Sequence, residues 1–337
     1  MISATTTVLN DLDRRIVAAL QVNGRAPWSR IAEVLCEPER TVARRGTQLL
    51  DEGLITITAL PARHRRAWGE LAVLALRCAP AAARFAAMAL ARRTDSTFAY
   101  LVAGAADCVA EIWADDRSLT TLLLDELPAT PGLVQVSTHP ILRYYRTMDD
   151  WQPGILTDDE AKALADGRPR VDIRLDAAPV PLTGENQAIL HALCRHGRRT
   201  HQELARLAGI SEATARRRLE ALRAEGQVYF RTVVEPALLG LPVEALLWIR
   251  TAPADVDAVG EAVIASPLVR YAAAIMGSHQ LLVGVTAPHK PALHALLARS
   301  PWIAAVTAME TSLVVSAVKR SGVLARSVAI PDDATPI

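Results

Sequence analysis

The sequence predicts an α+β protein that contains two copies of one two-part unit. The first observation is a repeat: residues 9–55 align without a gap with residues 182–228, at an offset of 173. The second is that apolar residues in each stretch recur at helical spacing in three short blocks. The third is that strand-like runs, separated by alanine- and leucine-rich helical runs, follow each stretch. A repeat of this length indicates that whole domains were duplicated.

The repeat depends on identical residues spread along both copies. The matched pairs are Ile16 and Ile189, Leu20 and Leu193, Gly24 and Gly197, Ala32 and Ala205, Thr41 and Thr214, Leu49 and Leu222, and Gly53 and Gly226. Beyond them the same offset aligns Gly104 with Gly277. Near the end, a shift of three residues aligns residues 131–138 with residues 301–308. The repeat therefore covers nearly the whole chain.

The second copy begins with three predicted helices. Thr200 and Glu203 fit a capping box at the start of the second helix, and Ser211 is a good N-cap for the third. Gly209 suits the turn between them. Three short helices with a glycine turn before the third predict a helix-turn-helix domain of the winged or tri-helical kind over residues 182–230.

The first copy predicts the same domain over residues 8–56, with three departures. Pro27 stands where the second copy has its capping threonine, and residues 36–38 read CEP where the second copy reads GIS. Gly46 replaces the core-facing Leu219, and a glycine inside a helix costs about 1 kcal/mol relative to alanine. We expect the first head to be less stable than the second, or specialised.

Four strand-like and two helical runs follow the first helix-turn-helix. The strands are expected at residues 70–77, 97–104, 107–114 and 133–138, and the helices at 81–93 and 116–127. This order is the ferredoxin-like βαββαβ plan. The second copy repeats it, so we expect ferredoxin-like domains over residues 68–146 and 240–320.

Residues 147–181, between the copies, are rich in Pro and Asp. We expect them to be mostly linker. Thr157 and Glu160 fit a capping box for one short helix that ends at Gly167.

Composition restricts the function classes. The chain has 337 residues, is 51% apolar and has a formal net charge of +1, so contacts with nucleic acid require a local basic patch. The richest apolar run, residues 71–91, is interrupted by Arg77, Pro80 and Arg84. Because no basic-then-apolar leader opens the sequence either, we expect a cytoplasmic protein with no membrane partner.

Ordinary catalytic and metal motifs do not occur in the sequence. The cysteines at positions 36, 78, 108 and 194 form no CxxC pair and are expected to be reduced thiols. His191, His196 and His201 step by five residues and share no helix face. Walker, GxSxG and HExxH motifs do not occur. We expect no metal, no cofactor and no enzymatic activity.

The repeated unit resembles the Lrp/AsnC family of transcriptional regulators. LNDLDRRIVAALQVNGR (9–25) is similar to the opening helix of that family, ELARLAGISEATARRRLEALRAEGQV (203–228) to its second and recognition helices, and VVEPALLGL (233–241) to its hinge. The resemblance implies a sequence-specific regulator that binds double-stranded DNA. It also implies ligand-sensing (RAM) domains that pair through their sheets and often sense an amino acid. Two units in one chain imply an intramolecular pseudo-dimer, and whole chains are expected to associate further.

Helical phase separates the arginines of the second recognition helix. At 100° per residue, Arg217 points directly away from the core and Arg216 lies on one flank. Arg218 lies at the core edge, where a phosphate or an acidic neighbour meets it. The first copy presents Arg40 and Arg44 on its outward face. The expected DNA contacts are Arg40, Thr41, Arg44, Arg45, Ser211, Thr214, Arg216, Arg217 and Arg218.

The two heads are expected to differ in sequence preference and in affinity. Arg40 stands where the second copy has Ala213, and an arginine that reads guanine contributes about 1–3 kcal/mol of discrimination. Residues 182–228 contain eight Arg and five Glu, net +3, whereas residues 9–55 contain seven Arg and seven acidic residues. We expect the second head to bind DNA more tightly, at a half-site of different sequence.

The resemblance also places an effector site near the turn between the two central strands, often with a Gly-x-x-Asp pattern. GAAD (104–107) keeps the pattern, and GSHQ (277–280) replaces the acid. A carboxylate pairs better with a ligand ammonium than an amide does, so the first copy is the better candidate. A tight turn capped by aspartate explains the motif equally well. The effector candidates are Gly104, Asp107, Ser137, Thr138, Gly277 and Gln280.

Two other function classes stay open. Siroheme decarboxylases share this two-domain architecture and occur as fused units, in which histidine and arginine act on the tetrapyrrole and its carboxylates. Their central strands usually have a Tyr-Asn-x-Trp-Phe-Thr-like stretch, which residues 107–114 and 279–286 lack. The remaining class is an assembly or effector-binding protein whose heads have lost DNA affinity, which the salt dependence of DNA binding would distinguish.

Overall fold

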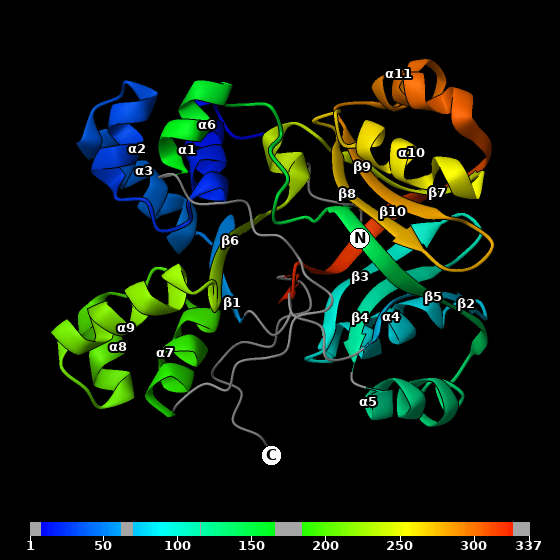
Figure 1. Ribbon diagram of the computed structural model, residues 1–337, viewed down its shortest axis with the longest axis horizontal. Helices are drawn as coiled ribbons and strands as arrows, with labels where there is room; N and C mark the ends of the chain where they lie inside the picture. The colour runs from blue at the N-terminus through cyan, green and yellow to red at the C-terminus, as the bar shows by residue number, and fades with distance from the viewer. Residues whose placement is uncertain (1–7, 62–69, 115, 166–183, 326–337) are drawn as a thin grey trace. The chain divides into compact units, whose positions relative to one another are not determined.

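The computed structural model describes residues 8–61, 70–114, 116–165 and 184–325. They form two compact units. The first unit contains the described parts of Met1–Trp68 and Asp149–Pro242, and the second those of Gly69–Met148 and Val243–Ile337 (Figure 1). Each sequence copy therefore contributes its helical part to one unit and its strand-rich part to the other.

The first unit contains two helix-turn-helix heads. The first head consists of α1 (Asp11–Val22), α2 (Trp28–Leu35) and α3 (Glu39–Asp51). The second head consists of α7 (Gly184–Arg195), α8 (His201–Ala208) and α9 (Glu212–Ala224). Each helix of the second head begins 173 residues after its counterpart. The helical part of the predicted repeat is confirmed.

A two-stranded antiparallel ladder joins the two heads. It pairs β1 (Ile55–Pro61) with β6 (Val228–Val234) over seven residues of each strand. In Figure 1 the ladder lies between the two groups of helices. Ile55 packs in the core of the first head, whereas Ala59 and Val228 pack in the core of the second. The ladder is therefore anchored in both heads.

A further helix, α6 (Asp158–Leu164), follows the first copy. Thr157 accepts a hydrogen bond from the backbone N–H of Glu160, and the glutamate carboxylate accepts one from the backbone N–H of Thr157. The predicted capping box is therefore confirmed. The helix ends at Leu164, and Gly167, where its end was expected, lies outside the described residues.

The segment before and including α6 packs on the first head. Trp151 and Leu164 are 1% and 0% exposed and lie in the same apolar core as Ile16 and Ile31. Burial of an indole and an isobutyl group is worth several kcal/mol. Residues 149–165, expected to be linker, are therefore an integral part of the first head.

The second unit contains two ferredoxin-like domains. The first has β2 (Glu70–Cys78), α4 (Ala83–Arg92), β3 (Ser96–Ala103), β4 (Cys108–Ala114), α5 (Asp116–Thr121) with a π-helical turn (Leu122–Glu126), and β5 (Leu133–Arg146). The second has β7 (Val243–Thr251), α10 (Val256–Val263), β8 (Val269–Ile275), β9 (Leu281–Ala287), α11 (Lys290–Arg299) and β10 (Val306–Arg320), followed by β11 (Val323–Leu324). Short 3₁₀ turns, Pro236–Leu239, Pro253–Asp255 and Pro301–Ala305, precede β7, α10 and β10. The predicted fold class is confirmed.

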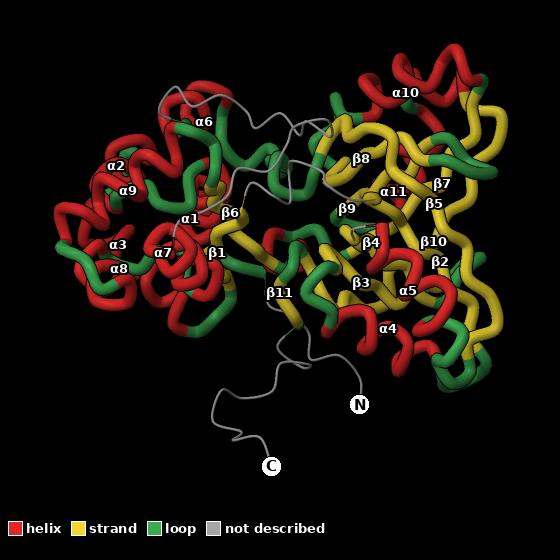
Figure 2. The backbone as a smooth tube through the Cα atoms, turned by 60° about the horizontal axis from the view of Figure 1, so that its bottom comes forward, coloured by secondary structure: helices red, strands yellow, loops and turns green. Residues whose placement is uncertain are grey.

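The strands of both domains form one continuous sheet that closes on itself. Their order is β11-β10-β3-β4-β2-β5-β8-β9-β7, and β10 also pairs with β7. The domains meet at two seams, β5 with β8 and β10 with β3. Helices α4, α5, α10 and α11 lie outside the strands (Figure 2). One face of each strand therefore points into the interior of a closed barrel.

Strand pairing keeps the offset of 173 to the end of the repeat. Ala75 lies opposite Ser137 in the first domain, and its counterpart Trp248 lies opposite Glu310 in the second. The three-residue shift expected from the sequence is therefore wrong. A shared proline favoured that shift, but backbone hydrogen bonding determines the register, and Pro301 begins a 3₁₀ turn outside the strand.

Candidate functional site

The recognition helix of the second head, α9, begins at a side-chain cap. Ser211 accepts a hydrogen bond from the backbone N–H of Thr214 at 3.2 Å, and the two hydroxyl oxygens lie 2.8 Å apart. Ala215 and Leu219 are buried in the core. Because the helix repeats every 3.6 residues, this start places Arg217 on the exposed side.

The three adjacent arginines of α9 have three different surroundings. Arg217 is exposed. Arg216 is also exposed and forms an ion pair with Glu220, one turn further along, at 3.1 Å. Arg218 is half-buried and reaches two polar residues at the start of α7, at 3.2 and 3.6 Å. The arginines do not form one basic patch, in agreement with their helical phase.

The recognition helix of the first head, α3, presents Arg40 and Arg44 to solvent, with Thr41 half-buried. Arg45 instead donates two hydrogen bonds to the carboxylate of Asp13 on α1, at 2.7 and 2.9 Å. Arg45 is the counterpart of Arg218 in the second head. Each of these two arginines therefore braces a recognition helix against the first helix of its own head.

The turn before α3 differs from the turn before α9 in backbone conformation and in capping. Cys36 adopts the left-handed backbone conformation, with φ of 55°, where the second head has Gly209 with φ of 67°. A residue with a Cβ in this conformation costs about 1–2 kcal/mol. Pro38 is the N-cap of α3 and provides no side-chain hydrogen bond. The turn and the N-cap at the start of α3 are therefore less favourable than those at the start of α9.

Gly46, inside α3, provides space for a neighbouring indole. A Cβ at this position would lie 2.4 Å from the ring of Trp28. The indole thus occupies the region that Leu219 fills in the second head, and the guanidinium of Arg198 lies 4.2 Å above its ring. The glycine that the sequence marks as a weak point is therefore a packing requirement.

Two equivalent arginines fasten the heads to each other. Arg25 donates to two backbone carbonyls in the α7–α8 turn at 2.6 and 3.1 Å. Its counterpart Arg198 donates to two carbonyls in the α1–α2 turn at 2.9 and 3.1 Å. Burial lowers the pKa of both guanidinium groups to about 10, and at Arg25 the charge of Arg198 contributes. The heads are therefore joined by a two-fold related exchange of contacts.

The segment of residues 149–165, which contains α6, makes the first head acidic. Glu160 pairs with Arg15 of α1 at 2.6 Å, and Arg30 of α2 donates to a carbonyl of α6 at 3.0 Å. Residues 149–165 contain five acidic residues and one lysine, which takes this head from net 0 to net −4. The second head remains at net +3 over residues 182–228.

A pocket of about 310 Å³ lies in the second unit. It is lined by Ala75, Arg77, Ala105, Ala106, Gln135, Ser137, His139, Trp248, Ser278, His279 and Glu310. These residues come from both ferredoxin-like domains. Leu74 and Leu76 pack under the helices, so the alternate residues of β2 face the barrel interior. The pocket is therefore on the interior side of the sheet.

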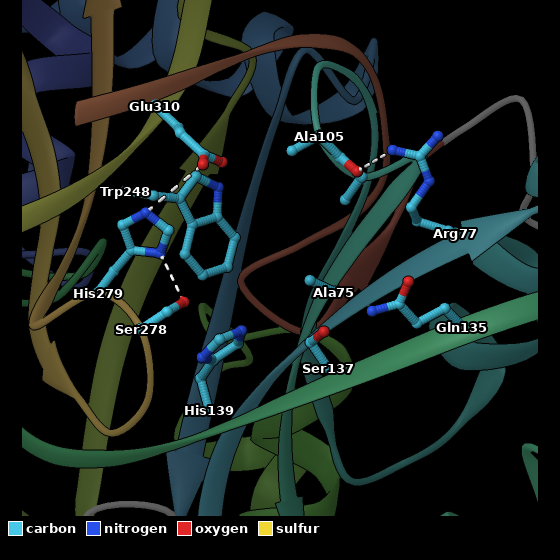
Figure 3. Close-up of a pocket in the computed structure, with 11 residues that line it drawn as sticks. Ala75, Arg77, Ala105, Gln135, Ser137, His139, Trp248, Ser278, His279 and Glu310 are labelled. Atoms are coloured by element: carbon cyan, nitrogen blue, oxygen red, sulfur yellow. Dashed lines mark hydrogen bonds and ion pairs between the residues drawn. The ribbon is translucent and has the colours of Figure 1, made fainter. Parts of the chain in front are cut away.

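Three buried rings lie together at this pocket (Figure 3). The ring centroid of Trp248 is 5.1 Å from that of His139 and 6.0 Å from that of His279. Nδ1 of His139 lies 3.1 Å from a backbone carbonyl oxygen, which can only accept a hydrogen bond, so Nδ1 carries a proton. Burial lowers the pKa of His279, and neighbouring Arg250 and His139 lower it further, against the carboxylate of Glu310.

Part of the expected effector set lies at this pocket. Ser137 lines it, whereas Thr138 is the next residue of the strand and points to the opposite face. Asp107 accepts a hydrogen bond from the backbone N–H at residue 78 at 2.8 Å, and Gln280 accepts one from the equivalent N–H at residue 251 at 3.2 Å. Both side chains therefore fasten their turns to the end of a strand.

The two glycines of the expected effector set allow residues of neighbouring strands to approach the backbone closely. A Cβ on Gly104 would lie 2.7 Å from Ser312 Oγ, and a Cβ on Gly277, which has φ of 124°, would lie 2.8 Å from Nδ1 of His139. Sequence reasoning missed Trp248, His139, His279 and Glu310. Because alternate residues of a strand share a face, Ser137 indicates that His139 lies on the same face. Trp248, His279 and Glu310 come close to His139 only because the sheet closes.

The described residues contain neither a candidate membrane span nor a candidate metal site. None of the helices there is long and apolar enough to cross a membrane. Nor do three or more His, Cys, Asp or Glu side chains gather in the described ranges in a way that would hold a metal ion.

Comparison with known proteins matches the chain in several segments. The AsnC-type helix-turn-helix domain matches residues 9–50 and 186–223, and the Lrp/AsnC ligand binding domain matches residues 244–324. The HTH-type transcriptional regulator PF1231 of Pyrococcus furiosus is 32% identical over 133 residues, which are 39% of this chain and 90% of the relative. The regulator PYRAB01370 of Pyrococcus abyssi is 28% identical over 132 residues, 39% of this chain and 84% of the relative.

The four-domain architecture is similar to a solved structure. The crystal structure of the siroheme decarboxylase NirDL has a TM-score of 0.59 and 13% sequence identity, and the match covers 92% of this chain and 93% of that chain. At this identity the similarity concerns the fold.

Proposed function

Because the chain belongs to the Lrp/AsnC family of DNA-binding transcriptional regulators, we propose that one chain binds double-stranded DNA through two unequal heads. The observation that supports this best is the reciprocal contact of Arg25 and Arg198, which holds both recognition helices in one unit. Helix-turn-helix dimers bind two half-sites with two heads, and here one chain supplies both. A regulator that acts on chromosomal DNA works in the cytoplasm.

Helix α9 supplies the main base contacts. Arg217 faces outward from it, and Thr214 and Ser211 lie at its first turn, the part of a recognition helix that meets base edges. Arg216 lies on the flank and suits a phosphate or the wall of the groove. Arg218 holds α9 against α7 and meets the DNA only at the edge of the protein–DNA interface. In the first head the proposed contacts are Arg40, Thr41, Arg44 and Arg45. The last three are the counterparts of Thr214, Arg217 and Arg218.

The first head binds DNA more weakly than the second. Its charge is −4 once the segment with α6 is included, and phosphates repel an acidic surface. Its recognition helix also starts without a side-chain cap. We expect this head to tune the site preference of the chain, with Arg40 in the place of Ala213 as the distinguishing residue, and the second head to supply most of the affinity.

Two substitutions test the heads separately. Arg217→Ala should weaken binding to a selected operator about fivefold to 150-fold, since a base-reading arginine contributes about 1–3 kcal/mol. Arg44→Ala should weaken it less and change the preferred bases of the other half-site. Fluorescence anisotropy at several salt concentrations measures both, with Arg299→Ala on the exposed side of α11 as the matched control.

Two results would contradict the proposal. If both variants bound the operator like the parent chain, with the same site preference, α3 and α9 would not be the reading helices. Binding that did not weaken as salt rises would exclude ordinary phosphate contacts. In that case the chain would be an assembly or effector-binding protein.

A small effector binds in the pocket of the second unit. Concave sites with a few placed polar groups are the usual ligand sites, and this pocket lies where both ligand-sensing domains meet. An amino-acid-like molecule is the expected class. Asp107 and Gln280 shape the turns beside it, Gly104 and Gly277 allow the close approach of neighbouring strands, and Ser137 with Thr138 belongs to the strand that forms one wall.

The fold of NirDL raises a tetrapyrrole decarboxylase as the second candidate. The imidazoles of His139 and His279, which line the pocket, favour this second candidate. A tetrapyrrole with many carboxylates needs several cationic partners, and Arg77 is the one arginine that lines this pocket among the described residues. Titration of the purified chain with siroheme distinguishes the two: a regulator leaves the absorption spectrum unchanged and shifts promoter DNA.

Whole chains associate further. The family resemblance supports this expectation, and Phe85 on α4 and Leu124 on the π-helical turn after α5 are exposed apolar side chains, 58% and 69% accessible. Sedimentation velocity of the full chain, with and without DNA, measures the number of chains per complex.

A further inference from the structure

One face of the first head is covered by residues 149–165. Their helix, α6, lies against α1 and α2 (Figure 1), and Glu160 in its first turn pairs with Arg15 of α1. Two carbonyls near the end of α6 accept hydrogen bonds, from Asn23 of α1 at 3.3 Å and from Arg30 of α2 at 3.0 Å. The chain therefore shows which kind of segment this face of a head binds.

The covered face is withdrawn from water. Ala18 and Asn23 are 4% and 8% exposed, and Val22 and Val34 pack against the core of the first head as partly buried side chains. Ala18 and Val22 follow Arg15 at helical spacing, so they lie on the same side of α1. These positions describe the face with its cover in place.

The equivalent face of the second head, on α7 and α8, is open at the same positions within the described part of the chain. Leu207, the counterpart of Val34, is 46% exposed. A single exposed leucine is ordinary on a protein surface, but this one stands where the other copy packs its apolar side chain. Exposed side chains also replace Ala18, Val22 and Asn23. The α7–α8 face consists of Ala188, His191, Arg195, His196 and Leu207.

The α7–α8 face is basic, whereas the segment that covers the first head is acidic. Residues 149–165 contain five acidic residues and one lysine. Arg195 lies in the last turn of α7 and is exposed. The carboxylate of nearby Glu203 is already engaged, because it accepts the backbone N–H of Thr200 at 2.7 Å and pairs with Arg199 at 3.4 Å. The charge of this face therefore complements an acidic segment.

We propose that the α7–α8 face binds an acidic amphipathic helix of a partner protein, in the way that the first head binds its own α6. The apolar side of that helix packs on Leu207 and Ala188, and its carboxylates meet Arg195 and the two histidines of the face. Docking of an amphipathic helix through its apolar side is a recurring mode of recognition. The same face is filled in one head by a segment of this chemistry and is open in the other.

Binding at this face requires neither DNA nor an effector. Arg44 of α3 remains exposed although the segment with α6 is docked on the same head. Its counterpart Arg217 should therefore stay accessible on α9 when a helix covers the α7–α8 face. Protein binding and DNA binding are thus expected to use separate surfaces of the second head.

The test is an anisotropy titration of the full chain with a fluorescent peptide of residues 155–165, ILTDDEAKALA, which copies the acidic helix. The peptide should occupy one site per chain, because the other face already holds its own segment. A peptide with Asp158→Asn, Asp159→Asn and Glu160→Gln should bind at least tenfold more weakly. The difference should shrink as salt rises, because it comes from charge.

Two exposed positions locate the site on the chain. Leu207→Asp should weaken peptide binding at least tenfold, since it places a charge where the apolar side of the helix packs. Arg195→Ala should weaken it severalfold at low salt and leave operator binding unchanged. Arg217→Ala removes the same charge from the same head and is the matched control: it should weaken operator binding and leave peptide binding unchanged.

Three results would overturn the inference. The first is a peptide that does not bind, or that binds equally well to Leu207→Asp and Arg195→Ala. The second is a loss of operator binding in Arg195→Ala, which would assign the face to DNA phosphates. The third is a lower number of chains per complex in Leu207→Asp by sedimentation velocity, which would assign the face to a second copy of the chain. Peptide binding by a chain that binds no DNA would keep this site and remove the DNA function.

Discussion

At the scale of single residues, some equivalent positions of the repeat have the same structural role and others do not. Arg45 and Arg218 have kept one task, since each braces a recognition helix against the first helix of its head. Gly46 and Leu219 have not, because the glycine makes room for Trp28 and the leucine fills the core itself. Helical phase alone predicted the place of Arg218. It did not predict that Trp28 packs against Gly46, because a glycine has no side chain whose character would indicate its packing partner.

Replacing Gly46 with alanine tests this packing. Alanine gains about 1 kcal/mol of helix propensity over glycine, but its Cβ would lie 2.4 Å from the indole. Overpacking of a filled core costs about 1–3 kcal/mol, so Gly46→Ala should lower the free energy of unfolding. Urea unfolding measures it, with Gly184→Ala as the control, since a Cβ there meets no atom within 4 Å. A more stable Gly46→Ala variant would contradict the packing role.

At the scale of elements, α6 makes the two heads unequal. Its capping box was readable from Thr157 and Glu160, but its docking was not, because a Pro- and Asp-rich stretch has the composition of a linker. Trp151 and Leu164 supply the apolar anchors, and Ile16 and Ile31 of the same core lie more than 100 residues earlier in the chain. The docked segment covers the first head with acidic residues.

The charge of α6 should lower DNA affinity. Neutralising its two exposed acids, in Asp158→Asn with Asp159→Asn, should strengthen operator binding a few-fold at low salt and less at high salt, because the repulsion is electrostatic. Anisotropy titrations measure this, and Asp125→Asn in the second unit is the control. An unchanged affinity at low salt would mean that α6 lies too far from the phosphates to act.

Acid should loosen α6 from the first head. The pKa of Glu160 is lowered, chiefly because its carboxylate accepts the backbone N–H of Thr157, with a contribution from Arg15. A carboxyl with a lowered folded-state pKa contributes stability that is present above its ordinary value of 4.5 and is lost as pH falls through the folded value. Thermal melts of the parent and Glu160→Gln should therefore differ at neutral pH and converge in acid. Parallel curves at all pH values would exclude this role for Glu160.

At the scale of the whole molecule, duplication in one chain has replaced assembly of two. The helical parts of both copies form one unit, and the strand-rich parts form the other. The sequence indicated this pairing through the repeat, but only strand registers established it: β1 pairs with β6, β5 with β8, and β10 with β3. Register also corrected the alignment near the end of the repeat.

The exchange of arginines should make one chain sufficient for two heads. Arg25→Ala removes two charge-assisted hydrogen bonds to carbonyls, each worth about 1.5–3 kcal/mol, and should weaken operator binding while leaving the far-UV spectrum unchanged. Arg198→Ala should do the same, and the double variant should lose less than the sum, since both act on one interface. Strict additivity would mean that the arginines act independently. The control is Arg195→Ala, which is exposed on α7.

Local patterns in the sequence were enough to predict the repeat, the helix-turn-helix and ferredoxin-like plans, the caps at Thr157, Thr200 and Ser211, and the outward place of Arg217. These features depend on local periodicity and on hydrogen bonds between near neighbours, which a linear pattern records. The folded chain was needed to show that α6 belongs to the first head, that Arg25 and Arg198 join the heads, and that the rings of His139, Trp248 and His279 meet in one pocket. The contacts of α6, of the two arginines and of His139 with Trp248 join residues more than 100 positions apart, and the closure of the barrel and the pairing of the heads bring them together.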